Sequence, residues 1–378
     1  MIIKNAEVFS GNRFQRGSVE FDERFQALYL DDAAESGVHT GEEVLDAKDC
    51  YLIPGLVDIH THAAVDADAS DGDIEGLHRM SKYYAAGGVT TFFPTTLTLP
   101  EEQLRKAIRA AREYVREKDE ARIGGVHLEG PFINMEKRGA QNPDYIKTPD
   151  LDMFKRLVDE GQGLVKFITI APETEGAIEF IEEASKDCRV SLGHTACDYE
   201  TAMKAFGAGA THLTHLYNAM PSLLHRAPGL IAAGVDAGAE AELIVDGLHS
   251  HPAMVRLAHK MFGENLILIS DSARCAGMPD GEYELGGIPI ELKEGKATIK
   301  GSDTIAGSAI HLMDGLRNAA QFGIPLEKAV YAATTRPAIS AGIDDEVGSI
   351  KEGLLADMVL LDRDLSVKAV FVDGERIK

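Results

Sequence analysis

The chain has 378 residues, and 44% of them are hydrophobic, which is enough to bury a large core. The formal net charge is −23, and the sequence has no basic stripe that could neutralise phosphates. This argues against nucleic acid or an anionic membrane as a binding partner. No window approaches about eighteen consecutive apolar residues, and the N-terminus lacks a signal pattern. We therefore expect a cytoplasmic protein. The four cysteines have no Cys-x-x-Cys spacing and are too few for a disulfide scaffold, so we expect reduced thiols.

The first elements expected along the chain are β-strands. Residues 2–9 and 17–30 alternate between apolar and polar side chains, which is typical of strands with one buried face. Residues 356–362 and 367–372, near the other end, show the same alternation. We therefore expect the two termini to pair in a small β-sandwich domain. Its predicted boundaries are residues 1–52 and 342–378.

Short apolar segments that alternate with segments of helical length fill the middle of the chain. The predicted strands are Leu56–His62, Val89–Pro94, Ile123–Glu129, Leu164–Ala171, Arg189–His194, Thr211–His215, Ala241–His249 and Leu266–Asp271. The amphipathic segments between them include 101–118, 150–160, 174–186 and 252–262. Parallel strands need such crossovers, so the alternation indicates an α/β protein with a parallel sheet. Eight units favour a closed (β/α)8 barrel of the TIM type, over residues 53–341.

Two histidines, with one residue between them, lie at the end of the first of these strands. Side chains alternate between the faces of a strand, so His60 and His62 share a face with Asp58 and could bind one cation together. Active sites of such barrels lie at the carboxyl ends of the strands. Residues able to bind a metal or move a proton end five further strands, namely Glu129, His194, His215, His249 and Asp271.

One carboxylate and two imidazoles, from Glu129, His194 and His215, form the open three-ligand set that a hydrolytic metal prefers. His212 lies three residues before His215 and hence on the opposite face of a strand, so we expect only His215 at the barrel mouth. The His60 and His62 pair could complete this site or hold a second ion. A divalent ion of this kind suits hydrolysis of an unactivated amide. Asp271 is then placed to take a proton from water and return it to the leaving amine.

Seven motifs occur in order along the chain: PGLVDIHTH, HLEGPF, SLGHT, THLTHLYNAMP, IVDGLH, ISDS and IAGSA. In combination they resemble the N-acetylglucosamine-6-phosphate deacetylases of the amidohydrolase superfamily. The resemblance spans nearly the whole chain, because the closing GSIKEGLLADMVLLD also matches the accessory domain of that superfamily. It implies hydrolysis of N-acetyl-D-glucosamine 6-phosphate to D-glucosamine 6-phosphate and acetate. It also implies a homodimer with one or two divalent ions per subunit. The mixed nitrogen and oxygen ligands accept Zn, Fe, Mn, Co or Ni, so the metal stays open.

The resemblance also assigns roles to single residues. Glu129, His194 and His215 correspond to the tight metal ligands of the family and Asp271 to its catalytic acid and base, while His60 and His62 match members that hold a second ion. His249 corresponds to a contact near the scissile carbonyl, where it could donate to the developing oxyanion. Arg226 corresponds to the sugar-phosphate contact, supplied by the neighbouring subunit. Other implied substrate contacts are Ala140, Asn218, Ala219, Ile305, Ala306 and Gly307.

The chain departs from the family pattern at two places. Gln141 stands in EKRGAQNP where the family usually has a histidine, which would alter one polar or phosphate contact. After His62 the chain continues with Ala-Ala-Val-Asp-Ala-Asp in place of a glycine-rich sequence. That loop borders the His60 and His62 pair, so the number of ions and the sugar stereochemistry stay open.

Three other functions are compatible with such a barrel. A deacetylase of a related amino-sugar phosphate, such as N-acetylgalactosamine 6-phosphate, would differ only in how the loops recognise one hydroxyl. A dihydroorotase-like cyclic amidase would need a modified lysine on the fourth strand, where Lys166 lies, but Glu129 already fills the bridging position. A catalytically inert barrel that acts as an interaction protein is disfavoured, because every ligand and the acid/base residue are present.

Overall fold

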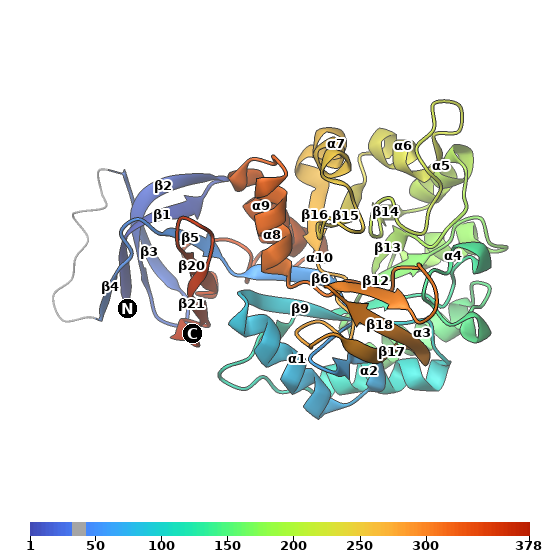
Figure 1. The fold of residues 1–378 in the computed structure, drawn as a ribbon, viewed down its shortest axis with the longest axis horizontal. Helices are drawn as coiled ribbons and strands as arrows, with labels where there is room; N and C mark the ends of the chain where they lie inside the picture. The colour runs from blue at the N-terminus through green and yellow to red at the C-terminus, as the bar shows by residue number, and fades with distance from the viewer. Residues whose placement is uncertain (32–42) are drawn as a thin grey trace.

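The computed structural model describes residues 1–31 and 43–378. Residues 32–42 belong to the predicted N-terminal part of the β-sandwich domain and lie outside the described residues. Figure 1 shows a barrel of strands surrounded by helices, with a second sheet beside it that contains both termini. The predicted α/β class and the barrel are therefore confirmed.

The barrel wall consists of eight parallel strands that pair in chain order. They are β6 (Leu56–Thr61), β9 (Val89–Thr96), β11 (Val126–Glu129), β12 (Val165–Ile170), β13 (Arg189–Leu192), β14 (Ala210–Leu213), β15 (Glu240–Ile244) and β16 (Leu266–Ile269). A short extra strand, β10 (Arg122–Ile123), also pairs with β9. Several strands end earlier than predicted, so that His194, His215, His249 and Asp271 lie in the loops that follow them.

Hydrogen bonds between the first and last strands bring the ends of the barrel together. The backbone N–H of Asp271 donates to the carbonyl oxygen of His60 at 2.9 Å, and the N–H of His62 donates to the carbonyl oxygen of Ser272 at 3.1 Å. The N–H of Ser270 reaches a carboxylate oxygen of Asp58 at 3.3 Å. These bonds place the ends of β6 and β16 side by side, where the predicted site residues are.

Helices cover the outside of the barrel. They are α1 (Ile74–Ala86), α2 (Glu101–Glu113), α3 (Leu151–Gly161), α4 (Ala177–Ala184), α5 (Tyr199–Gly207), α6 (Gly229–Ala237), α7 (Pro252–Phe262), α8 (Leu312–Gln321) and α9 (Leu326–Ala333). A further helix, α10 (Thr335–Ala341), packs Ala338 and Ala341 into the apolar cluster of the barrel interior. In α2, Leu104, Ile108 and Ala111 recur at helical spacing and are buried. Within residues 1–31 and 43–378, no helix has both the length and the apolar character needed to span a membrane.

Two apolar layers hold the barrel. The larger lies between the strands and the helices and includes Leu128, Ile168 and Leu243. The smaller includes Phe93, Phe167, Ile244, Ile267 and Ile269, which stand one position away from the larger layer along their strands and fill the barrel interior. Complete burial of such a side chain stabilises the fold by about 1.5–3 kcal/mol. The barrel is a packed core, and its open end is left for the site.

Strands from both termini form one further sheet, as the sequence predicts. Its strands are β1 (Ile2–Ser10), β2 (Arg13–Phe21), β3 (Phe25–Leu30), β4 (Val44–Asp46), β5 (Tyr51–Pro54), β20 (Met358–Leu361), β21 (Val367–Val372) and β22 (Glu375–Arg376). The antiparallel pairing of β5 with β20 joins the two ends of the chain. This sheet has its own core, which includes Phe21, Phe25 and Phe371. The predicted domain boundaries stay a prediction.

A small insertion that the sequence did not predict follows β16. It is an antiparallel sheet of β17 (Gly281–Leu285), β18 (Ile288–Lys293) and β19 (Lys296–Ile299). A second insertion after β6 pairs β7 (Ala63–Ala64) with β8 (Ala67–Asp68). Leu285, at the end of β17, lines the cavity at the open end of the barrel. The larger insertion therefore supplies part of the wall of the candidate site.

Candidate active site

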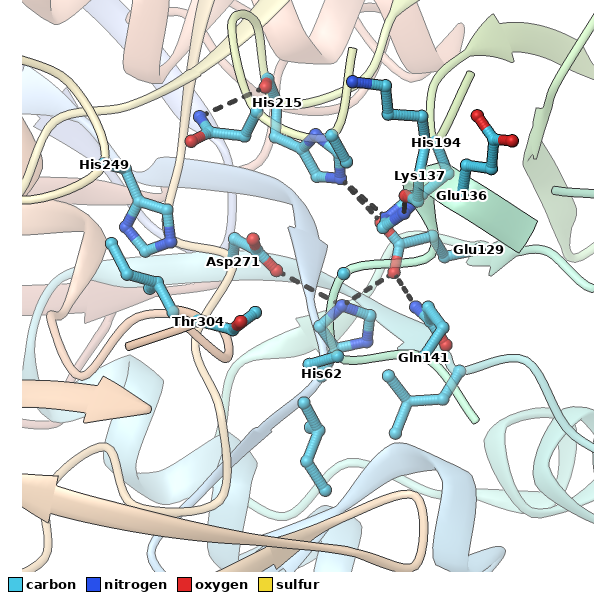
Figure 2. A pocket seen from close by; sticks show the side chains of 18 residues that line it. His62, Glu129, Glu136, Lys137, Gln141, His194, His215, His249, Asp271 and Thr304 are labelled. Atoms are coloured by element: carbon cyan, nitrogen blue, oxygen red, sulfur yellow. Dashed lines mark hydrogen bonds and ion pairs between the residues drawn. The ribbon is translucent and has the colours of Figure 1, made fainter. Parts of the chain in front are cut away.

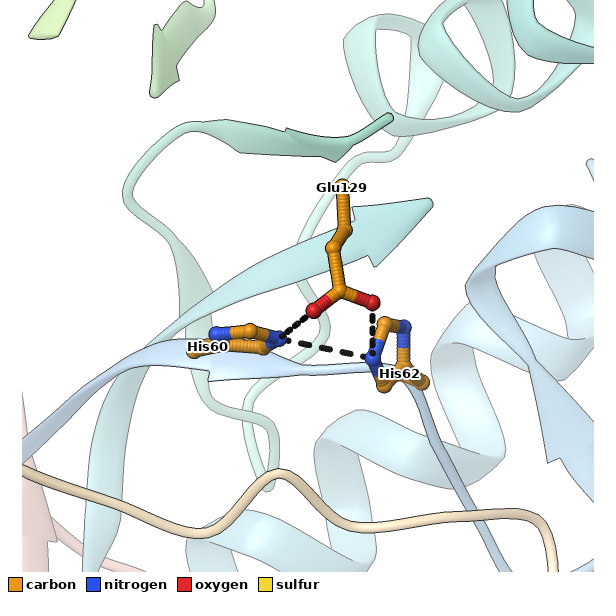
Figure 3. A group of neighbouring side chains, drawn as sticks. All are labelled: His60, His62 and Glu129. Carbon is orange, nitrogen blue, oxygen red and sulfur yellow. Dashed lines mark hydrogen bonds and ion pairs between the residues drawn. The ribbon is translucent and has the colours of Figure 1, made fainter. Parts of the chain in front are cut away.

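The carboxylate of Glu129 lies among four imidazoles. Its Oε1 is 3.0 Å from Nε2 of His215, 3.2 Å from Nε2 of His194 and 3.4 Å from Nε2 of His60. Its Oε2 is 3.3 Å from Nε2 of His62. Figure 3 shows Glu129 directed at the His60 and His62 pair. Two triads that share Glu129 therefore meet at the carboxyl ends of β6 and β11.

Three of the four rings are oriented by acceptors at their Nδ1 atoms. Nδ1 of His62 donates to the carbonyl oxygen of Thr95 at 3.0 Å, and Nδ1 of His194 donates to the carbonyl oxygen of Lys137 at 2.8 Å. Nδ1 of His60 lies 2.8 Å from a carboxylate oxygen of Glu242. A ring that donates from Nδ1 carries its lone pair on Nε2, which faces the centre of the site. This donor set of nitrogens and one carboxylate fits a divalent transition-metal ion.

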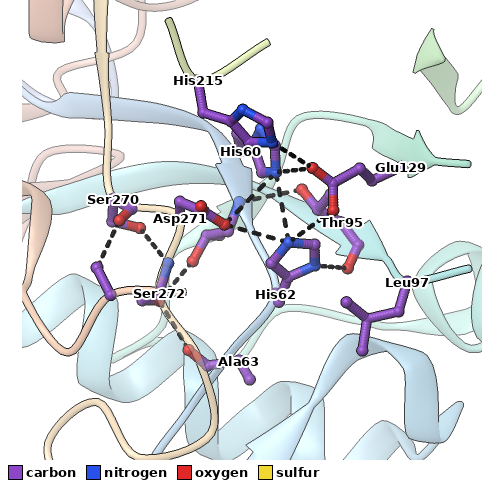
Figure 4. A network of polar contacts seen from close by, with 12 residues as sticks. His60, His62, Ala63, Thr95, Leu97, Glu129, His215, Ser270, Asp271 and Ser272 are labelled. Carbon is purple, nitrogen blue, oxygen red and sulfur yellow. Dashed lines mark hydrogen bonds and ion pairs between the residues drawn. The ribbon is translucent and has the colours of Figure 1, made fainter. Parts of the chain in front are cut away.

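Asp271 lies on the other side of the His60 and His62 pair, as Figure 4 shows. Its Oδ1 is 3.2 Å from Nε2 of His62 and 3.6 Å from Nε2 of His60. Burial raises the pKa of Asp271, but the hydrogen bond from His62 and the charge of His60 outweigh it and lower the pKa to about 2. Asp271 is thus an ionised carboxylate beside the candidate ligands, able to accept a proton.

The carboxylates give the site a strong preference for positive charge. Burial alone would lower the pKa of His62, but its hydrogen bonds to Asp271 and Glu129 raise that pKa to about 10. For His194 burial also acts against the charged ring, and the charge of Glu129 nevertheless raises its pKa. A bound divalent cation would satisfy the same preference in place of these protons.

Three of the site residues have backbone conformations that non-glycine residues rarely adopt. The φ angles of His194, His215 and Asp271 are 47°, 30° and 48°. Each residue follows the end of its strand, and a positive φ there ends the strand and turns the side chain into the barrel mouth. Such conformations cost of order 1–3 kcal/mol each and are concentrated at functional sites. They also explain why these strands are shorter than predicted.

A cavity of about 400 Å³ opens above these residues (Figure 2). Its wall contains His62, Glu129, His194, His215 and Asp271. It also contains most residues predicted to contact a substrate, namely Ala140, Gln141, Asn218, Ala219, His249, Ile305 and Gly307. His60 is completely buried beneath the cavity floor, and Ala306 is buried behind its two neighbours.

His249 is held by a carboxylate of its own loop. Its Nδ1 lies 2.6 Å from Oδ2 of Asp246, and the same carboxylate accepts the backbone N–H of His249 at 2.8 Å. Burial lowers the pKa of His249, but the hydrogen bond with Asp246 more than compensates and raises it. The raised pKa favours the doubly protonated ring, in which Nδ1 donates to Asp246 and Nε2 can donate a second hydrogen bond.

Gln141 contacts Glu129 directly. Its side-chain amide nitrogen donates a hydrogen bond to Oε2 of Glu129. Its side-chain Oε1 accepts a hydrogen bond from the backbone N–H of Thr98 at 2.7 Å. The side chain is buried and lies on the cavity wall. The departure from the family pattern at this position thus orients the shared carboxylate between the two triads.

Comparison with known proteins agrees with this geometry. The model of the Amidohydrolase family matches residues 51–377. The chain belongs to the amidohydrolase family. It is similar to the N-acetylglucosamine-6-phosphate deacetylase of Bacillus subtilis (strain 168), with 36% identity over 334 residues, which covers 86% of this chain and 84% of that relative.

Two further relatives are similar to the chain over most of its length. The chain is 34% identical over 328 residues to the N-acetylgalactosamine-6-phosphate deacetylase of Escherichia coli O157:H7, which covers 86% of this chain and 87% of that relative. A solved structure of a mutant N-acetyl-D-glucosamine-6-phosphate deacetylase from Mycobacterium smegmatis, in complex with N-acetyl-D-glucosamine-6-phosphate, superimposes with a TM-score of 0.92 and 33% identity. The match covers 100% of this chain and 99% of that one.

Arg226 lies apart from the cavity of this amidohydrolase. It is exposed on the loop after β14, where its guanidinium lies 2.6 Å from the ring of His225, and it is not part of the cavity wall. Lys166 lines a different surface hollow, together with Arg122, and so cannot bridge ions at the site. His212 is completely buried and bonds to Ser340 at 2.6 Å, away from Glu129.

Sequence reasoning missed several residues of the site in this amidohydrolase. Leu97, Lys137, Leu285 and Thr304 line the cavity, and Glu242 and Asp246 hold two of its histidines. These cavity residues carry no signal because they lie in the segments that follow barrel strands, which have an ordinary composition. Glu242 did have one, since a carboxylate in the middle of the apolar strand AELIV is unusual unless it is paired.

Proposed function

We propose that this amidohydrolase removes acetate from N-acetyl-D-glucosamine 6-phosphate by metal-dependent hydrolysis of its amide, which leaves D-glucosamine 6-phosphate. The observation that carries the proposal is the position of the Asp271 carboxylate, 3.2 Å from the nearest His62 ring atom, on the floor of a cavity of about 400 Å³. A cavity of this size suits a monosaccharide phosphate.

Glu129, His194 and His215 would hold one divalent ion, and His60 and His62 would share Glu129 to hold a second. When bound, such an ion polarises a carbonyl and lowers the pKa of water, which is the chemistry that an unactivated amide requires. The nitrogen and carboxylate donors accept Zn, Fe, Mn, Co or Ni.

Three side chains then have separate roles in the reaction. Asp271 takes a proton from the attacking water and returns it to the amine nitrogen as the C–N bond breaks. His249, oriented by Asp246, donates a hydrogen bond from Nε2 to the carbonyl oxygen, where negative charge develops. Gln141 keeps the carboxylate of Glu129 between the two triads.

The phosphate contact is proposed to come from a second copy of the chain in a homodimer. Arg226 is exposed on a loop that also carries the exposed Leu223 and Leu224, and Leu248 is exposed close to His249. Leu223 and the exposed Leu257 line one surface hollow beside His249. Exposed apolar side chains that lie together are typical of an interface, and a dimer would cover them. A guanidinium from that loop suits a phosphate because it offers two parallel hydrogen bonds.

We propose the cytoplasm as the location. The cysteines Cys50, Cys188, Cys197 and Cys275 are all free thiols, which fits a reducing compartment.

N-acetylgalactosamine 6-phosphate is the second candidate substrate. It is supported by the 34% identity to the Escherichia coli O157:H7 relative of that name. The two sugars differ in the orientation of one hydroxyl, so they would place the acetyl group and the phosphate in the same positions.

The deciding experiment measures acetate release from N-acetylglucosamine 6-phosphate, N-acetylgalactosamine 6-phosphate and unphosphorylated N-acetylglucosamine by the protein loaded with Zn²⁺. We expect the highest kcat/KM with the first. A preference for the second would keep the mechanism and change the substrate. No release from any of them, with metal bound, would contradict the proposed function.

A further inference from the structure

A buried carboxylate behind the candidate metal site has no part in the proposed reaction. Glu242 lies on β15 with a side chain that is 0% exposed, and its Oε2 is 2.8 Å from Nδ1 of His60, which is also 0% exposed. The same oxygen accepts the backbone N–H of His215 at 3.3 Å. One carboxylate oxygen of Glu242 therefore contacts the ring of His60 and the backbone N–H of His215, and both residues are predicted ligands.

A buried carboxylate at the position of Glu242 is expected to destabilise the fold. Its Oε1 is buried and has no hydrogen-bond partner in the described part of the chain. Over residues 1–31 and 43–378, no lysine or arginine forms an ion pair with it, and its ion-pair partner is His60. A buried charge that is only partly satisfied disfavours folding, so its presence is best explained by an effect on its neighbour.

The effect on His60 follows from the chemistry of the carboxylate. An ionised carboxylate only accepts hydrogen bonds, so Nδ1 of His60 must carry the proton and Nε2 the lone pair. That Nε2 lies 3.4 Å from Oε1 of Glu129 and 3.4 Å from Nε2 of His62, where a shared cation would sit. His62 and His194 are held by neutral carbonyl oxygens, whereas His60 is held by a charged group.

The added negative charge also affects how many ions the site needs. Glu129 and Asp271 border the site, and Glu242 lies one imidazole away from it. These carboxylates carry three negative charges. One divalent ion would leave a negative charge uncompensated, whereas two divalent ions would neutralise all three. Proximity of such charges in a buried region favours the second cation.

A different arrangement, in which Glu242 itself binds an ion together with His60 and His127, does not fit the contacts. These three residues lie close enough for a metal site. However, Nδ1 of His127 lies 3.2 Å from the carbonyl oxygen of Ile59, and Nε2 lies 2.9 Å from the hydroxyl of Thr169. Both ring nitrogens of His127 are therefore engaged in hydrogen bonds.

We infer that Glu242 is a positioning residue that makes His60 a metal ligand and thereby gives each subunit a second divalent ion, at His60, His62 and Glu129. This inference rests on the proposed function and specifies its metal content. Glu242 acts through His60 and contacts neither the ion nor the substrate.

The test is a Zn²⁺ titration of the purified full-length protein, with the bound metal measured by elemental analysis and the affinities by competition with a chromophoric chelator. Wild-type protein is expected to bind two ions per subunit. Glu242→Gln keeps the size and a hydrogen-bond acceptor but loses the charge, and Glu242→Ala loses both. Each should keep one tight ion and bind the second about 10–100-fold more weakly, with the larger effect in the alanine variant.

Glu240→Gln is the matched control. Glu240 is another buried carboxylate two residues earlier on β15, but it pairs with Arg336 and accepts a hydrogen bond from Ser340 at 2.6 Å. Its replacement should leave both ions bound with unchanged affinity. Thermal unfolding of all variants, followed by circular dichroism, reports whether each one folds.

A double-mutant cycle separates positioning from a general structural effect. His60→Ala should lose the second ion, and adding Glu242→Ala to it should not change the affinity of the remaining ion, because the partner is already gone. The inference is overturned if both Glu242 variants bind two ions as tightly as wild type. It is also overturned if Glu242→Ala weakens the first ion in the His60→Ala background, or if wild type binds one ion that His60→Ala does not affect. A wild-type protein that binds no Zn²⁺ would instead contradict the proposed function itself.

Discussion

The backbone N–H of Asp271 donates a 2.9 Å hydrogen bond to the carbonyl oxygen of His60. The candidate base and a candidate ligand are therefore fixed to each other by one of the bonds that close the barrel between β16 and β6. The 3.2 Å separation of Asp271 and His62 is set by this closure and does not depend on a long loop. Sites built on such rigid elements hold their geometry most accurately.

Replacement of Asp271 by Asn should remove the base while it keeps the size of the side chain. We expect kcat to fall by roughly 10²–10⁴, the usual effect of a lost acid/base group, with substrate affinity retained. Steady-state kinetics and calorimetric binding of the substrate measure the two effects separately. An unchanged kcat would show that another group moves the proton.

Gly307 should be a sensitive position because it packs against the backbone of Asp271. Its φ is +65°, and an added Cβ would lie 3.1 Å from the carbonyl oxygen of Asp271 and 3.0 Å from Cβ of Ala273. Gly307→Ala should reduce kcat by about tenfold, since an active-site displacement below about 1 Å can have such an effect. Gly301→Ala is the control, because its φ is +79° but nothing lies within 4 Å of the new Cβ. Equal kinetics of the two variants would exclude this effect.

Arg226→Ala should weaken binding of phosphorylated substrates only. Loss of a hydrogen bond to a charged group costs about 1.5–3 kcal/mol, so kcat/KM for the sugar phosphate should fall roughly 10–100-fold. The value for unphosphorylated N-acetylglucosamine should stay the same. An equal loss for both sugars would argue against a phosphate contact.

The same variant tests whether the arginine comes from the partner. Arg226→Ala protein mixed and reassembled with Asp271→Asn protein would contain hybrid dimers in which one site has an intact Asp271 and receives an intact Arg226. Activity of the mixture above that of either variant alone is expected. No recovery, in the presence of demonstrated hybrids, would mean that the arginine acts within its own subunit or not at all.

Removal of divalent ions by a chelator should abolish acetate release and lower the midpoint of thermal unfolding, because the ions bind only the folded protein. Zn²⁺ or Co²⁺ should restore both properties. Mg²⁺ should restore little, since it prefers oxygen ligands and this site offers mostly imidazole nitrogen. Full activity after exhaustive dialysis against the chelator, with no metal detected, would contradict a metal-dependent reaction.

Glu160 should make the stability of the fold sensitive to acid. Hydrogen bonds from Arg109 and Arg105 outweigh the effect of burial and lower the pKa of Glu160 to about 2. Because the folded pKa lies below the unfolded value of about 4.3, this carboxylate stabilises the fold above that value and loses its contribution as the pH falls toward 2. Urea unfolding should show a shallower decline over this range for Glu160→Gln than for wild type. Replacement of the exposed Glu102 by Gln should leave the wild-type slope unchanged.

Much of the barrel could be predicted because its strands are short, mostly apolar segments, such as Leu266–Ile269, that alternate with amphipathic segments of helical length. The ends of the strands could not, because the positive φ angles of His194, His215 and Asp271 leave no mark on the hydropathy pattern. The insertion of β17 to β19 was missed, although its Leu285 lines the cavity. Its strands are short and each of them buries only one or two residues, so the apolar pattern is weak there.

The sequence by itself determined the barrel class, the pairing of the two termini and the chemical types of the candidate ligands, because these depend on local periodicity and on side-chain identity. Only the tertiary structure decided that Glu129 is shared by two triads, that Gln141 holds it and that Glu242 holds His60. These contacts join residues as far as 182 positions apart. Their distances follow from the register and closure of eight strands, which no single segment of the chain contains.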